Sequence, residues 1–242
     1  LLGEWRAENY FALNMERSVD LPQDAVREPA GFHSLRQVAM HLDPAEAALA
    51  AQAKAMIHWH QAHQFCGWCG HATRGEEAGY VRRCTNPACG KLQFPRVDPA
   101  IIVLVTHGKR GLLGRQPTWP KEMYSNIAGF AEPGESLETA VSREVWEETG
   151  VRIRRVTYHS SQPWPFPRSL MVGFTAEAAS ERITLNDGEL EDARWFTRDE
   201  IRQGLREGRM RLPSPYSISY HLIEDWYDKE ADIPLDEVLR QT

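Results

Sequence analysis

The chain has 242 residues, 42% of them hydrophobic, and a formal net charge of -6. This length suffices to bury one large core or two modest ones, so the sequence predicts a globular protein. It contains no apolar run of the roughly 18 to 20 residues that a membrane span needs and no N-terminal secretory signal, so we expect a cytoplasmic protein that does not enter a membrane. The acidic balance argues against a protein that grips nucleic acid mainly through its phosphates, and an anionic substrate would need metal ions.

The first 60 residues predict the remainder of a small N-terminal domain plus a linking helix. The chain opens "LLGEWRAENY" without a methionine, so we expect that a segment precedes it. The stretch "AEAALAAQAKAMIHWHQAH" is rich in helix formers. We expect His58, His60 and His63 along the end of a polar face of this helix.

All the cysteines of the chain lie close together, which predicts a zinc ribbon over residues 61–97. Cys66 and Cys69 are separated by two residues, and Cys84 and Cys89 by four, with a hairpin-length spacer between the pairs. Such a ribbon presents four thiolates tetrahedrally to zinc and leaves no position open for water, so the ion is expected to be structural. The longer second spacing loosens the match, and two disulfides or four free thiols are the alternatives.

The remaining residues, 98–242, predict a second domain that begins with a sheet. The run "FPRVDPAIIVLVTH" joins a turn-rich connector to a buried β-branched strand, with "GLLGRQ" as its hairpin partner. A domain boundary near residue 97 follows. The C-terminal stretch "YSISYHLIEDWYD" has helical spacing and is expected to pack across the sheet.

The stretch "GFAEPGESLETAVSREVWEETGV" predicts a loop followed by a helix that begins after Ser136 and ends at Gly150. Leu137, Val141 and Val145 recur at four-residue spacing and give the helix an apolar face that packs on a sheet.

Three acids, Glu144, Glu147 and Glu148, fall at i, i+3 and i+4 of this helix. Carboxylates so close repel one another, so a group outside the helix is expected to offset their charge. Mg²⁺ and Mn²⁺ take oxygen ligands and bridge protein carboxylates to phosphates. The alternative is a solvated acidic face, against which Arg143 and the glycine-bracketed loop argue.

The stretch "SQPWPFPRS", residues 161–169, holds three prolines around Trp164 and Phe166. Proline fixes φ and lacks a backbone donor, so we expect a stiff extended loop that no regular ladder stabilises. Such a loop preorganises its aromatic rings for a ligand at little cost in entropy. Plain core packing of the two rings is the alternative.

These motifs resemble those of a known family. The acidic helix and its loop match every fixed position of the Nudix box, G-x5-E-x7-R-E-U-x-E-E-x-G-U with U aliphatic, at Gly129, Glu135, Arg143, Glu144, Val145, Glu147, Glu148, Gly150 and Val151. "SQPWPFPRS" is similar to the signature of the NADH pyrophosphatases within that superfamily, and a zinc ribbon belongs to the same subfamily. The resemblance implies an α+β Nudix fold, a mixed sheet between helices, preceded by a zinc ribbon and part of a small N-terminal domain.

The resemblance also implies an activity. Nudix enzymes of this subfamily split NADH at its pyrophosphate into reduced nicotinamide mononucleotide and AMP. NAD and NAD-capped RNA contain the same bond, and a homodimer is implied. Two other readings stay open, namely a catalytically silent Nudix nucleotide sensor and a nucleic-acid adaptor built on the zinc ribbon.

The resemblance assigns catalytic roles to Glu144, Glu147 and Glu148, and leaves open which of them is the general base. The implied ligands of several Mg²⁺ or Mn²⁺ ions are these three residues, the carbonyl of Ala128 and Glu189. An ordinary exposed acid is the alternative for Glu189, with Glu191 and Asp192 as rivals. Glu135 and Arg143 are expected to form an ion pair that fixes the loop on the helix.

The substrate-binding residues that the resemblance implies lie in several segments. They are Arg36, Phe94, Phe130, Gln162, Pro163, Trp164, Pro165, Phe166, Pro167, Arg168, Ser169 and Ser219. Phe94 and Phe130 are the stacking candidates, and the ribbon-side aromatic commonly reaches the partner subunit's site. A merely solvated side chain is the alternative for Arg36.

Overall fold

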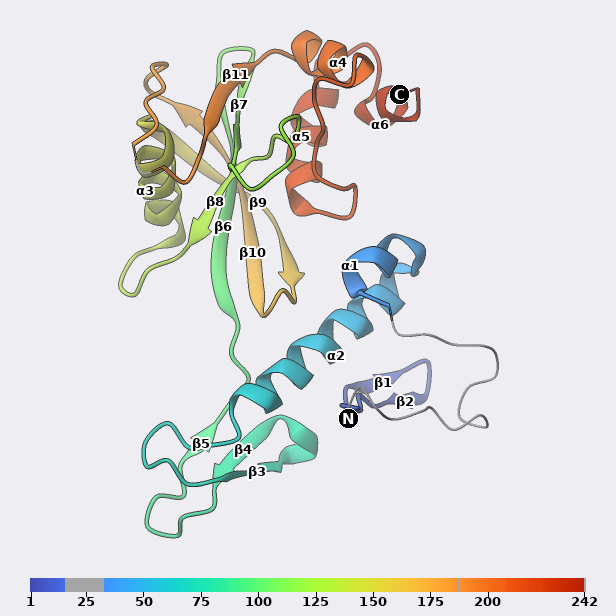
Figure 1. Ribbon diagram of the computed structural model, residues 1–242, viewed down its shortest axis with the longest axis vertical. Helices are drawn as coiled ribbons and strands as arrows, with labels where there is room; N and C mark the ends of the chain where they lie inside the picture. Colours follow the sequence, from blue (N-terminus) through green and yellow to red (C-terminus); the bar gives the residue numbers. More distant parts are fainter. Residues whose placement is uncertain (16–32, 187, 242) are drawn as a thin grey trace. The chain divides into compact units, whose positions relative to one another are not determined.

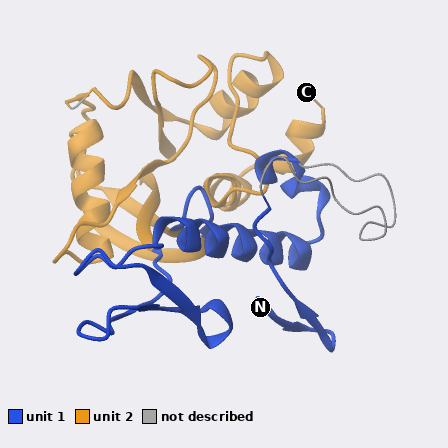
Figure 2. Ribbon diagram, turned by 60° about the horizontal axis from the view of Figure 1, so that its bottom comes forward, with its two compact units in different colours: residues 1–97, 163–169 blue, residues 98–162, 170–242 orange. Residues whose placement is uncertain are grey.

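The computed structural model describes residues 1–15, 33–186 and 188–241 (Figure 1). The chain divides into two compact units, shown in different colours in Figure 2. Unit 1 comprises Leu1–Val97 and Pro163–Ser169, and unit 2 comprises Asp98–Gln162 and Leu170–Thr242. Within the described residues, no helix combines the length and the hydropathy that a bilayer crossing requires.

Unit 1 begins with short elements and one long helix. They are β1 (Gly3–Trp5), β2 (Glu8–Tyr10), α1 (Leu35–Val38), the 3-10 helix η1 (Ala39–His41) and α2 (Pro44–Ala62). The sequence sets the start of α2 with a capping box. The Asp43 carboxylate accepts hydrogen bonds from the backbone N–H groups of Ala45 and Glu46 at 2.8 and 2.9 Å, and the Glu46 side chain accepts one from Asp43 N–H.

The histidines at the end of α2 lie partly inside the unit. His58, His60 and His63 are all half-buried. The His60 ring packs on the ribbon segment, where Arg82 Nη1 donates to Nδ1 at 2.8 Å and Nε2 donates to the Gly79 carbonyl at 2.8 Å. The sequence did not predict that Arg82, a partner distant in sequence, covers His60.

The ribbon of unit 1 is a three-stranded antiparallel sheet. Its elements are β3 (Thr73–Glu76), the 3-10 helix η2 (Glu77–Gly79), β4 (Val81–Cys84) and β5 (Leu92–Gln93). The β3–β4 hairpin fills the spacer between the two cysteine pairs. Cys84 is the last residue of β4, so the ladder itself carries one of the four thiols.

Unit 2 is built on a six-stranded sheet. Its strands are β6 (Asp98–His107), β7 (Arg110–Arg115), β8 (Ile127–Phe130), β9 (Ile153–Trp164), β10 (Ser169–Ala178) and β11 (Asp192–Phe196). The order is β11-β7-β6-β10-β9, and β8 pairs with β6 beside this path. The predicted β6–β7 hairpin is confirmed, with Val105 opposite Leu112.

Helices cover both faces of this sheet, which confirms the expected layers (Figure 1). The helices of unit 2 are α3 (Leu137–Thr149), α4 (Arg198–Arg206), α5 (Ile218–Asp228) and α6 (Leu235–Arg240). Alternate residues of β6 enter two different cores, because successive strand side chains point to opposite faces. Ile101, Val103 and Val105 pack with α3, whereas Ile102 and Leu104 pack with α4, α5 and α6.

The predicted start and end of the helix are confirmed in α3. Ser136 is the N-cap, and its hydroxyl accepts a hydrogen bond from Thr139 N–H at 3.2 Å. Gly150 ends the helix with φ of 65°, a left-handed conformation that favours glycine. Val141 and Val145 are fully buried against the sheet, as predicted.

The proline-rich stretch is not entirely a loop. Ser161–Trp164 continues β9, and β10 begins at Ser169, so only residues 165–168 form the turn between the strands. The expectation of a segment without a ladder is wrong for its first four residues. The reason is the order of the strands. β9 lies at the edge of the sheet. An edge strand accommodates Pro163 because the backbone N–H groups on its outer side form no hydrogen bonds to another strand.

Candidate active site

The segment that matches the Nudix box, residues 129–151, brings Gly129 of β8 against Glu144 of α3, which we call the box helix. Gly129 lies in β8, and a Cβ atom on it would come 1.9 Å from Cδ of Glu144 and 2.0 Å from its Oε1. Non-bonded carbon atoms approach to about 3.5 Å, so no side chain fits at position 129 while Glu144 keeps this conformation. The glycine therefore lets the carboxylate lie directly against the backbone of β8.

Arg143 binds three carboxylates of the box at once. Its Nη2 donates to Glu135 Oε1 at 2.6 Å, and its Nη1 donates to Glu144 Oε1 at 2.9 Å and to Glu147 Oε2 at 3.0 Å. The expected Glu135–Arg143 ion pair is thus present, and it joins the loop to the helix. The Arg143 guanidinium lowers the pKa of the Glu135 carboxyl below its ordinary value.

The three acids of the helical turn differ in exposure. Glu148 is only 4% exposed, whereas 49% of the Glu147 side chain is exposed. The sequence led us to expect that cations offset their mutual repulsion, but Arg143 already offsets the charges of Glu144 and Glu147. Within the described residues, the only group of three or more metal-binding side chains close enough to share an ion is the cysteine cluster. A gathering of the box glutamates around Mg²⁺ or Mn²⁺ stays a prediction.

Glu189 lies outside the box helix and acts on it electrostatically. Burial is the main cause that raises the pKa of the Glu144 carboxyl, and the negative charges of Glu147 and Glu189 add to the effect, while Arg143 opposes it. Of the two alternatives to Glu189, Glu191 pairs with an arginine of β7 at 2.8 Å, and Asp192 accepts a hydrogen bond from a tyrosine hydroxyl. The role of Glu189 as a metal ligand stays a prediction.

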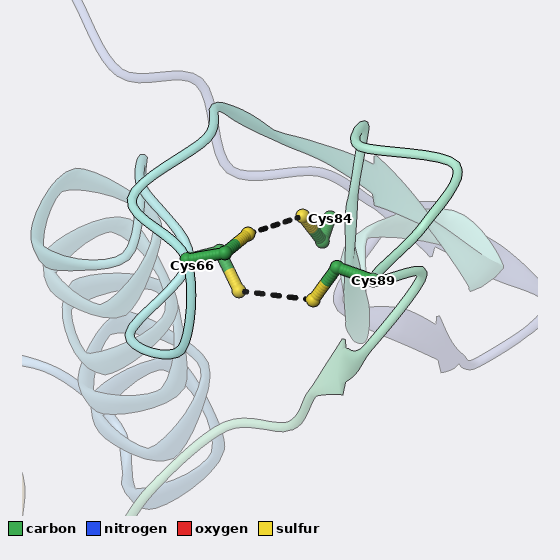
Figure 3. A group of neighbouring side chains, drawn as sticks. Cys66, Cys84 and Cys89 are labelled. Atoms are coloured by element: carbon green, nitrogen blue, oxygen red, sulfur yellow. Dashed lines mark hydrogen bonds between the residues drawn. The ribbon is translucent and has the colours of Figure 1, made fainter.

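The cysteines form one compact cluster (Figure 3). Their four Sγ atoms lie within 4.8 Å of one another, with Cys69 and Cys84 3.5 Å apart and Cys66 and Cys89 3.9 Å apart. All four are free thiols, so the disulfide alternative is wrong. Backbone N–H groups lower the pKa of the Cys66 thiol and lower that of Cys69 to about 6. Burial raises the pKa of the Cys84 thiol. Four sulfur atoms gathered this closely fit a structural zinc ion.

The turn after β9 carries the aromatic signature. The Trp164 and Phe166 rings meet edge to face, with centroids 5.2 Å apart, and both side chains are half-buried. The Arg36 guanidinium of α1 lies 4.2 Å from the centre of the Phe166 ring, and the Lys54 ammonium of α2 lies 5.6 Å from it. The structure thus brings Arg36 to the signature, and it adds Lys54, which sequence reasoning missed. Their contact with a substrate stays a prediction.

The other residues of the signature differ in burial. Pro165 and Ser169 are buried, Arg168 is half-buried, and Pro163 and Pro167 are exposed. Since the Trp164 and Phe166 rings are half-buried, they are neither fully packed into a core nor fully exposed to solvent.

Two residues that were predicted to bind substrate form hydrogen bonds within unit 2. The Gln162 side chain donates to the Tyr216 carbonyl at 2.6 Å and accepts from Ile218 N–H at 2.9 Å, so it fastens the start of α5. Ser219 is buried, and its hydroxyl accepts from Asn126 Nδ2 at 3.0 Å. Asn126 was missed as well, since no local pattern points from it to a partner this far along the chain.

The stacking candidates are open to solvent within their own units. Phe94 in unit 1 and Phe130 in unit 2 both have exposed rings. Ala128, whose carbonyl was predicted to bind metal, lies in β8 opposite Ile102 of β6.

Three family models match the chain. The model of the NADH pyrophosphatase-like rudimentary NUDIX domain matches residues 1–59, that of the NADH pyrophosphatase zinc ribbon domain matches residues 61–94, and that of the NUDIX domain matches residues 95–214. The chain belongs to the Nudix family. The models that match residues 1–59 and 61–94 are those of NADH pyrophosphatase domains, as the sequence motifs indicated.

Curated relatives of this Nudix chain carry similar names. It is 42% identical over 206 residues to the NAD-capped RNA hydrolase NUDT12 of Homo sapiens, covering 81% of this chain and 45% of that protein. It is 42% identical over 217 residues to the NAD-capped RNA hydrolase NudC of Mycobacterium bovis, covering 86% of this chain and 66% of that protein. The Nudix chain thus spans between about half and two thirds of the length of these relatives.

A solved structure supports the fold. The crystal structure of a NUDIX hydrolase from Nitrosomonas europaea superposes with a TM-score of 0.56 at 18% identity, covering 69% of this chain and 92% of that one. At this identity the likeness concerns the fold alone.

Proposed function

We propose that this Nudix protein hydrolyses the pyrophosphate bond of NADH or NAD, giving AMP and nicotinamide mononucleotide, and the same bond in NAD-capped RNA. The observation that carries the proposal is the placement of Glu144 against Gly129 by the box, in a chain that also holds the signature turn of residues 161–169. The names of the relatives from Homo sapiens and Mycobacterium bovis support the choice of substrate.

The donor set of the box fits Mg²⁺ or Mn²⁺. Both ions prefer oxygen ligands, which Glu144, Glu147, Glu148, Glu189 and the Ala128 carbonyl supply. Glu144 lies against Gly129, the residue next to Ala128 in β8, so two of the proposed donors are close together. When bound, these ions neutralise charge on the phosphates and lower the pKa of a water ligand.

The residues of the chain have distinct proposed tasks. Arg143 holds Glu144 and Glu147 in fixed positions, and one of the box glutamates accepts the proton of the attacking water. Phe94, Phe130 and the rings of the signature turn contact the flat nicotinamide and adenine groups. Because the turn is stiff, these contacts form with little loss of entropy.

The assembly and the compartment are proposals too. We propose a homodimer, supported by the exposed Phe94 ring on the ribbon, and size-exclusion chromatography with light scattering tests it. We propose the cytoplasm as the compartment, supported by four cysteines that are all free thiols, since thiols persist in reducing surroundings.

Product analysis tests the proposed reaction. Incubation with NADH and Mg²⁺ should release AMP and reduced nicotinamide mononucleotide, and Glu148→Gln should abolish turnover but spare binding of NADH. Capped RNA should yield a 5′-monophosphate end under the same conditions. Binding of NADH without any cleavage would contradict the proposal and support a silent sensor.

A further inference from the structure

The ribbon exposes an aromatic and cationic surface that the proposed reaction leaves unused. Phe65, Trp68 and Leu92 are exposed, and Trp68 is 76% exposed. The ammonium of Lys91 lies 3.9 Å from the centre of the Trp68 ring. An exposed aromatic ring that carries a cation on one face can bind a ligand on the other. We call Trp68 and Lys91 the Trp68 surface.

The two cysteine knuckles build this surface together. Phe65 and Trp68 belong to the first knuckle, around Cys66, and Lys91 and Leu92 follow Cys89 in the second. Gln93 Nε2 donates to the Phe65 carbonyl at 3.5 Å, so β5 runs beside the first knuckle. The surface therefore depends on the cluster that joins the knuckles.

The ribbon is locally basic although the whole chain is acidic. Residues 61–97 contain five Lys or Arg and two Glu, against a net charge of -6 for the chain. A zinc ion with four thiolates adds a charge of about -2 and leaves the segment positive. Glu76 is bound by Arg74 at 3.0 Å and by Arg83 at 2.8 Å. Lys91 and Arg96 are both exposed, so the segment can meet an anion.

We propose that the Trp68 surface binds single-stranded RNA, with a base stacked on the Trp68 ring and a phosphate beside Lys91. The inference rests on the proposed function, in which NAD-capped RNA is a substrate. Lys91 covers one face of the indole, and the exposure of the side chain leaves room for a base. Stacking accepts every base, which suits substrates that share a cap but differ in sequence. Tryptophan is enriched in protein interfaces but lysine is depleted there, so the lysine at the ring favours a polyanion over a second copy of the chain.

Binding of uncapped RNA tests the inference apart from catalysis. Fluorescence anisotropy with a single-stranded RNA of about ten nucleotides, a length typical of single-strand binding sites, gives the affinity. Trp68→Ala should weaken binding about fivefold or more, and Trp68→Phe should restore most of it, because the ring rather than the indole N–H binds the base. Trp68→Ala should also lower kcat/KM for NAD-capped RNA by a similar factor and leave kcat/KM for NADH unchanged.

A charge-matched pair of variants separates a local contact from general electrostatics. Lys91→Glu should weaken RNA binding and flatten its salt dependence more than Lys109→Glu, which makes the same charge change in the exposed β6–β7 turn of unit 2. Zinc content and circular dichroism confirm that each variant is folded.

The outcomes are distinguishable. RNA affinity unchanged in Trp68→Ala, or equal losses in the two lysine variants, would overturn the inference. Conversion of a dimer to a monomer by Trp68→Ala would overturn it in favour of a second copy of the chain. Trp68-dependent RNA binding by a protein that cleaves neither NADH nor capped RNA would uphold it while refuting the proposed function.

Discussion

Replacing Gly129 by alanine should abolish the proposed hydrolysis and destabilise the fold only modestly. The added Cβ would lie 1.9 Å from Cδ of Glu144, where a carbon contact needs about 3.5 Å, so the carboxylate must move by about 1.6 Å or rotate away. The clashing atoms are the end of a flexible side chain, so the strained rotamer and the weakened hydrogen bond with Arg143 together cost about 1 to 2 kcal/mol. Displacing a charged group that acts on the transition state lowers the rate by about 10² to 10³.

The assay measures both NADH turnover and urea unfolding for Gly129→Ala and for a control variant in the loop that follows β8. Gly134 has φ of 95° and no atom within 4 Å of an added Cβ. Gly134→Ala should therefore lose about 1 to 2 kcal/mol of stability through backbone strain but keep most of the activity. Wild-type turnover in Gly129→Ala, or a loss no larger than that of Gly134→Ala, would refute the reasoning.

Three further variants probe the supports of the fold. Arg143→Ala should lower the free energy of unfolding by about 2 to 4 kcal/mol in a urea titration, because it removes the cation shared by the mostly buried Glu135 and Glu144 and the half-exposed Glu147. In the same titration, Arg154→Ala, which removes an exposed ion pair with Glu177, should cost less than about 1 kcal/mol. Cys84→Ser should abolish zinc binding and make residues 61–97 the first site of limited proteolysis; retention of one zinc per chain would contradict a four-cysteine site. Gln162→Ala should cost about 1 to 3 kcal/mol by freeing the start of α5, and an unchanged urea midpoint would show that these hydrogen bonds do not hold the helix.

The features that the sequence predicted well are local or periodic. The cap at Ser136 and the stop at Gly150 depend on side chains within a few residues, and the buried face of Val141 and Val145 follows from helical spacing. The β6–β7 hairpin likewise follows from two apolar runs separated by a short turn. These signals need no knowledge of the tertiary fold.

The features that the sequence missed have distant causes. Whether Pro163 can continue a strand depends on β9 being an edge, and that is a property of the order of the whole sheet. His60 is covered by Arg82, and Lys54 lies near Phe166, which follows it by more than a hundred residues. The link between Asn126 and α5 is equally non-local. Such pairings arise from topology, which no short motif encodes.

The division of the chain has a practical consequence for fragment studies. The backbone passes from one unit to the other after Val97, after Gln162 and after Ser169. A clone of residues 98–242 would retain every strand of the large sheet. It would lack Arg36 and Lys54, which contact Phe166 in the turn between β9 and β10. The exposed aromatic rings of that turn would favour self-association. A protease cut after Val97 would likewise split unit 1 across two fragments. The smallest useful expression product is therefore the pair of units together, not the half that bears the box.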